Sequence, residues 1–96
     1  MIREIAALKT NDWSLDLEDE FYLEHWEDLL EDSAKAIRDT AEGCYVNLVT
    51  HGELGHPEER FIPELKKRLA ELGVPVKNIV YVDECGCGGH VTRVYR

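Results

Sequence analysis

The chain has 96 residues, the length of one small domain, and we expect a single α/β domain over residues 1–96. It carries 20 acidic and 11 basic residues, and its formal net charge of −9 disfavours nucleic acid and anionic lipid as partners. No apolar run reaches the ~18–20 residues of a membrane span, and the first residues lack a signal-peptide pattern. We therefore expect a cytoplasmic protein that binds neither nucleic acid nor membrane.

The first half of the chain predicts two extended segments and one long helix. An apolar run predicts a strand at 3–8, and residues 13–17 alternate between apolar and polar side chains, the period of a half-buried extended segment. From residue 19 to residue 41, apolar side chains recur every three or four positions while acids fill the positions between them. This spacing predicts an amphipathic helix with an acidic outer face.

The second half predicts a central strand at 45–50, a helix at 62–72 after a turn, a strand at 78–82 and a last strand at 91–95. Residues 78–82 are apolar on both faces, which is typical of a strand buried inside a sheet. A strand–helix–strand crossover makes strands 45–50 and 78–82 parallel. The fold class is therefore α/β: a small two-layer sandwich of order β-α-β-α-β-β, with a mixed sheet of about four strands and two helices.

Candidate functional side chains follow the carboxyl ends of the two parallel strands. His51 and His56 come after the first of these strands, and Cys85 and Cys87 come after the second. Parallel strands end at the same edge of a sheet, and open α/β sheets bind ligands there. The sequence thus predicts that the two loops, with His90 at the end of the cysteine loop, lie close together.

Glycines separate and follow the two thiols of this loop. Gly86, Gly88 and Gly89 tolerate positive φ and leave the backbone uncovered, so that another molecule can approach it closely. In a reducing compartment, the thiols are expected to be free, metal-bound or modified rather than in structural disulfides. Cys44 opens a strand, and we expect it to pack as a small apolar residue outside the site.

Residues 85–94, which read CGCGGHVTRV after Tyr81-Val82-Asp83, resemble the CGCGG family of proposed radical-SAM-modified ribosomal peptides, known chiefly from haloarchaea. Residues 46–52 (VNLVTHG) and 55–58 (GHPE) are similar to the family's central segment, and Trp13-Ser14 to its amino-terminal one. The resemblance implies a substrate rather than an enzyme. Its partner would be a radical S-adenosylmethionine enzyme, which could form a thioether from sulfur to a backbone carbon. The implied sites of modification are Cys85, Gly86, Cys87, Gly88 and Gly89.

Two other hypotheses remain open from the residues themselves. Cys85, Cys87 and His90, completed by His51 or His56, could ligate a metal in a binding or redox protein. The Cys-x-Cys spacing is not the usual one for zinc, and copper(I) or an iron–sulfur cluster is an alternative. Catalysis by the chain itself is the weakest hypothesis, because no set of nucleophile, base and orienting group stands out, and we assign no catalytic residue.

Overall fold

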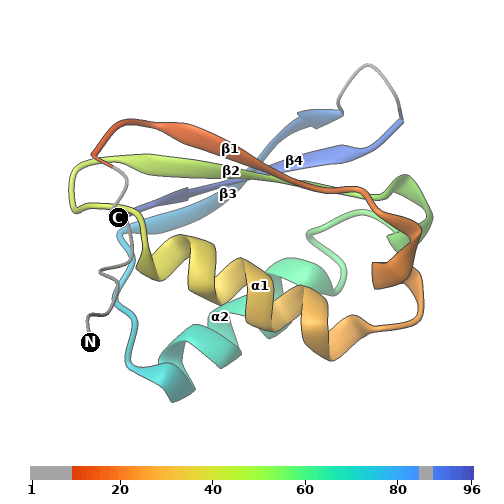
Figure 1. Cartoon of the computed structure of the whole chain (residues 1–96), viewed down its shortest axis with the longest axis horizontal. Helices are drawn as coiled ribbons and strands as arrows, with labels where there is room; N and C mark the ends of the chain where they lie inside the picture. Colours follow the sequence, from red (N-terminus) through yellow and green to blue (C-terminus); the bar gives the residue numbers. More distant parts are fainter. Residues whose placement is uncertain (1–9, 85–87) are drawn as a thin grey trace, which may run out of the picture.

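The computed structural model describes residues 10–84 and 88–96, so the strand expected at 3–8 and Cys85 to Cys87 lie outside the described residues. It confirms a small α/β fold with two helices and a four-stranded mixed sheet (Figure 1). The elements, in chain order, are β1 (Trp13–Leu17), the 3₁₀ turn η1 (Glu20–Leu23), α1 (Trp26–Arg38), β2 (Tyr45–Thr50), the 3₁₀ turn η2 (Gly52–Leu54), α2 (Phe61–Leu72), β3 (Asn78–Glu84) and β4 (His90–Tyr95).

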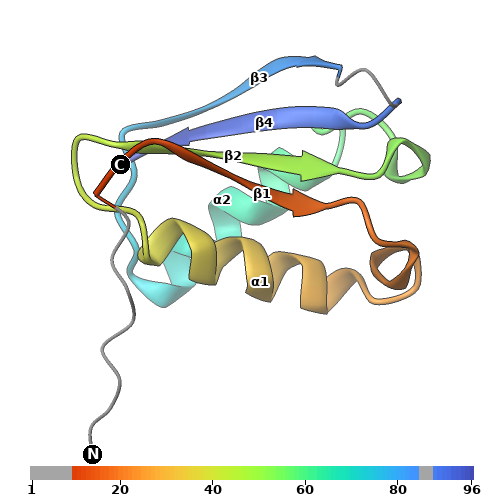
Figure 2. The ribbon, with the colours of Figure 1, turned by 45° about the horizontal axis from the view of Figure 1, so that its top comes forward.

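The strands are arranged in the order β1-β2-β4-β3. β1 runs parallel to β2, whereas β4 is antiparallel to both of its neighbours, β2 and β3. Both helices lie against one face of the sheet, and the other face carries no helix of the described residues in either view (Figures 1 and 2). Among the described residues, no helix has the length and apolarity needed to cross a membrane.

The core lies between the sheet and the two helices. Alternate residues of the strands point inward, which is why β2 repeats half-buried and buried positions along its whole length. The side chains that fill the core are Leu17, Val46, Leu48, Ile79 and Val94 from the sheet, and Leu29, Leu30, Ala34, Ala36, Ile37, Phe61, Ile62, Leu65 and Leu69 from the helices. On the outer surface, Arg68 of α2 bonds to Glu27 and Glu31 of α1 and ties the helices together.

The strand predicted at 78–82 is present, but the expectation that it is buried inside the sheet is wrong. β3 is an edge strand, because β4 inserts between β2 and β3 and pairs with both. Val82 is accordingly 42% exposed. The parallel direction of β2 and β3 is nevertheless correct, since each is antiparallel to β4.

The helix predicted at 19–41 is shorter in the structure and is preceded by a separate 3₁₀ turn. The Asp19 side chain accepts a hydrogen bond from the Phe21 N–H and caps η1, and the chain leaves the helical conformation at His25 before α1 begins. At the other end, α1 stops at Arg38. The Thr40 hydroxyl donates to the Ala36 carbonyl there and accepts a bond from the Trp13 indole N–H, which joins the helix end to β1.

The break between η1 and α1 sets the position of Tyr22, whose hydroxyl donates to Asp32 over 2.6 Å. This bond, together with burial and nearby carboxylates, raises the pKa of Tyr22 from 10.0 to about 12. The bond therefore stabilises the fold fully below pH 10, and that contribution is lost as the pH rises towards 12. Asp32→Ala should bring the Tyr22 pKa back towards 10. The measurement is the pH dependence of tyrosinate absorbance, and subtracting the same titration of a Tyr22→Phe variant isolates the signal of Tyr22. Identical Tyr22 titrations in the unsubstituted chain and in Asp32→Ala would contradict the prediction.

Candidate functional site

The ends of β2 and β3 and the start of β4 meet at one edge of the sheet. Thr50, the last residue of β2, and Glu84, the last residue of β3, both pair with His90, the first residue of β4. The predicted common edge is therefore confirmed for the described residues. β1 ends at the same edge, because it is parallel to β2 (Figure 2). We call this edge, with η2 and residues 88–90, the rim.

His51 begins the turn η2 directly after β2. Its Nδ1 atom accepts a hydrogen bond from the Glu53 N–H over 3.0 Å and caps the turn. His56 makes the same kind of bond five residues further along the chain: its Nδ1 atom accepts a hydrogen bond from the Glu58 N–H over 3.2 Å. Each histidine is half-buried. A neutral imidazole that accepts at Nδ1 carries its proton on Nε2, so both rings are set up as hydrogen-bond donors at Nε2.

His56 and His90 share a cluster of rings with Tyr81. The ring centre of Tyr81 lies 4.2 Å from that of His56, and the two histidine rings are 5.3 Å apart. The Tyr81 hydroxyl lies 3.0 Å from His90 Nδ1. Burial, with the charges of Glu84, Asp83 and Glu58, raises the pKa of Tyr81 above its ordinary value of 10.0.

The turn η2 lies against the described end of the cysteine loop at Gly52 and Gly88. A Cβ atom built on Gly52 would lie well under 3.0 Å from the carbonyl oxygen of Gly88, a separation that real side chains essentially never show. Position 52 therefore requires glycine because a side chain has no space there. Position 88 favours glycine for a different reason, since its φ of +94° lies in a region that other residues rarely adopt. These two glycines hold the described end of the loop against the turn that carries His51.

An open depression of about 510 Å³ lies at this contact, lined by Glu18, His51, Gly52, Glu53, Gly88 and Gly89. Gly88 is exposed, whereas Gly89, directly before β4, is buried. The depression is shallow and open, as expected for a small domain that cannot enclose a substrate.

The predicted site residues fall into two groups. His51, His56, His90, Gly88 and Gly89 lie at the rim, whereas Cys85, Gly86 and Cys87 lie outside the described residues. Cys44 is a half-buried free thiol just before β2, at the opposite end of the strand from the rim. Sequence reasoning missed Tyr81, although its place two residues after the inward-facing Ile79 could have marked it as a side chain near the core face.

The metal hypothesis depends on the two thiols outside the described residues. Among residues 10–84 and 88–96, no group of three or more His, Cys, Asp or Glu side chains is arranged to hold a metal ion. Coordination through Nε2 would also require His51 or His56 to move a proton and give up its bond to the backbone. The zinc, copper(I) or iron–sulfur site remains a prediction, and the hydrogen bonds of the histidines do not favour it.

These features define a class of protein: a small two-layer α/β protein that presents a glycine-rich hairpin loop at the rim of its sheet. A comparison with protein families then gives the particular family, since the family described as "Putative radical SAM target protein" matches residues 4–96. The chain belongs to this family, whose name implies that a radical SAM enzyme acts on it. No curated protein and no solved structure matches the chain.

Proposed function

We propose that the protein is a folded substrate that a radical S-adenosylmethionine enzyme modifies within residues 85–89. The observation that carries the proposal is the family match, which extends from residue 4 to residue 96 and so covers the helices and the sheet as well as the loop. A match confined to the loop would suggest a short peptide substrate. A match over the whole domain instead supports a substrate that is recognised in its folded form.

The proposed chemistry is a bond from a cysteine sulfur to a glycine Cα. The enzyme reduces S-adenosylmethionine with one electron to methionine and a 5′-deoxyadenosyl radical, which takes one hydrogen atom from the glycine Cα. The cysteine thiolate, its proton released to a base, then joins the carbon radical, and the surplus electron returns to the iron–sulfur cluster of the enzyme. Each crosslink removes two hydrogen atoms from the protein.

Glycine is suited to this reaction because no side chain shields its Cα. Of the two candidate glycines within the described residues, Gly88 is exposed and Gly89 is buried. This difference supports Gly88 over Gly89 as an acceptor carbon in the folded chain. The contact between Gly52 and Gly88 supports a scaffold role for the rest of the domain, which would present the loop in one position.

Mass spectrometry of protein isolated from the native host tests the proposal. We expect the peptide that contains residues 85–90 to lack two hydrogen atoms for each crosslink, while the chain expressed alone in a heterologous host keeps its unmodified mass. Cys85→Ser and Cys87→Ser, made in the native host, should each remove the crosslink that uses that sulfur, and Cys44→Ser serves as the matched control. An unmodified native chain that carries stoichiometric metal would contradict the proposal and support the metal hypothesis.

A further inference from the structure

β3 is an edge strand whose outer side pairs with no other strand of the described residues. It pairs with β4 alone, and the contact begins at Lys77, whose N–H donates to the Tyr95 carbonyl over 2.7 Å. Residues 79–82 are apolar or aromatic, and Val82 is 42% exposed. A sheet edge of this composition, with no charge in its middle, is suited to pairing with a further strand.

A groove between β3 and α2 borders this edge on the helix side of the sheet. It has a volume of about 320 Å³, and its apolar wall comes from Leu69, Ala70, Val74, Val76 and Ile79. Both charged residues of the described chain that line it are cations, Lys66 of α2 and Lys77 just before β3. Each is exposed, so they make a basic patch in a chain whose net charge is −9. The groove therefore favours an apolar strand that carries an acid.

The other end of β3 carries such an acid on the same face. Tyr81 packs against the core and its hydroxyl lies 3.0 Å from His90 Nδ1, so both side chains lie on the helix side. Glu84 is directly opposite His90 in the register and shares its face. The register shift between Tyr81 and Asp83 makes this possible, because in an unbroken strand residues 77 and 84 would point to opposite faces. Lys77 and Glu84 therefore both lie on the helix side.

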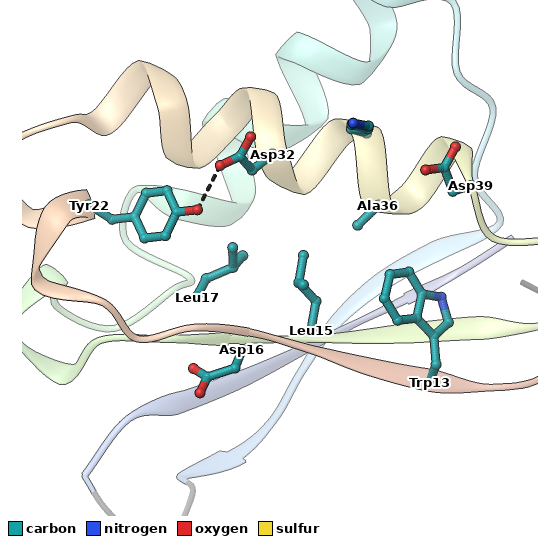
Figure 3. Close-up of a pocket in the computed structure, with 9 residues that line it drawn as sticks. Trp13, Leu15, Asp16, Leu17, Tyr22, Asp32, Ala36 and Asp39 are labelled. Atoms are coloured by element: carbon teal, nitrogen blue, oxygen red, sulfur yellow. Dashed lines mark hydrogen bonds between the residues drawn. The ribbon is translucent and has the colours of Figure 1, made fainter. Parts of the chain in front are cut away.

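β1, at the other edge of the sheet, does not offer the same match to a second copy of the chain. Its single charged residue is Asp16, whose side chain points to the face of the sheet opposite α1 (Figure 3). Antiparallel copies of β1 would therefore bring no cation opposite an acid. The two ends of β3 differ in charge, and this difference selects β3 as the edge for self-association.

We propose that two copies of the chain pair through β3, antiparallel and about a two-fold axis at Val80, and so join their sheets into one. Lys77 lies three positions before Val80, and Glu84 lies three paired positions after it, because the register shift leaves one residue out. Lys77 of each copy is then opposite Glu84 of the other, on the same face, and Lys66 borders the groove beside them. The surface is self-complementary, as a two-fold contact requires.

Sedimentation velocity of the full, unmodified chain over a range of concentrations tests the proposal. We expect a dimer whose dissociation constant rises about tenfold or more on Lys77→Glu or on Glu84→Lys, because each reversal sets like charges together twice in the symmetric contact. Lys67→Glu is the matched control. It reverses a neighbouring cation of α2 that lines a different depression, with Arg68 and Glu71, and should change the constant by about twofold or less.

A mixture of the two variants gives the sharpest outcome. Lys77→Glu chains and Glu84→Lys chains each repel their own copies, but together they regain an attractive pair at each end of β3. The mixture should therefore dimerise about as tightly as the unsubstituted chain, and hydrogen exchange of the β3 amides should slow as it does. A chain that stays monomeric at every concentration, a dimer that both reversals leave intact, or a mixture as weak as its components would overturn the proposal.

Discussion

Gly52→Ala is expected to lower the modification of the loop by about tenfold or more, because a small displacement of a reacting group can cost that much in rate. The new methyl group cannot coexist with the Gly88 carbonyl in its present place, so either η2 or the loop must move. The overpacking should cost about 1–3 kcal/mol of folding free energy, which leaves the chain folded. The measurement is the fraction of crosslinked loop after a fixed time with the enzyme, beside a urea unfolding curve.

Gly43→Ala is the matched control for this substitution. Gly43 lies in the turn before β2, at the far end of the sheet, and has a φ of +90°, and no atom of the described residues lies within 4 Å of a Cβ added there. Alanine at this position strains the backbone by about 1–2 kcal/mol without touching the rim. The two variants are thus destabilised to a similar extent, but only Gly52→Ala should lose modification. Equal modification of both would mean that the position of Gly88 does not matter to the enzyme.

Much of the fold is predictable because each element has a local pattern. The alternation at residues 13–17 and the β-branched run at 45–50 identify β1 and β2, and Gly73 in a left-handed conformation ends α2 at Leu72 as expected. The place of β3 is not predictable in the same way. Its apolar composition suggests an interior strand, but the order of strands depends on pairing between β2 and β4, which no local pattern contains.

The site divides in a similar way between predictable and unpredictable features. The meeting of His51 with the cysteine loop follows from topology alone, because parallel strands end at one edge. The contact of Gly52 with Gly88 involves only backbone atoms and leaves no signature beyond the presence of glycine. The bond between Tyr81 and His90 depends on hairpin register, which includes a shift after Tyr81. The two loops were therefore predictable as neighbours, but their individual contacts and the place of Tyr81 were not.

Recognition of the folded domain, rather than of the loop sequence, can be tested with Leu48→Ala. Leu48 is completely buried in the central strand β2, and its truncation should cost about 2–5 kcal/mol of folding free energy. This is a large part of the ~5–15 kcal/mol that stabilises a typical domain. At a urea concentration where the variant is unfolded and the unsubstituted chain is folded, we expect modification of the variant to fall with its folded fraction.

Leu72→Ala provides the control, because it makes the same chemical change at a side chain that is 51% exposed at the end of α2. It should change stability by about 0.5 kcal/mol or less, and its modification in the same urea shows that the enzyme remains active. Circular dichroism gives the folded fraction, and mass gives the modified fraction of the same samples. If the unfolded Leu48→Ala chain is crosslinked as fast as the Leu72→Ala chain, the enzyme recognises the loop sequence and does not need the folded domain. If crosslinking follows the folded fraction, the sheet, η2 and the loop act as one substrate.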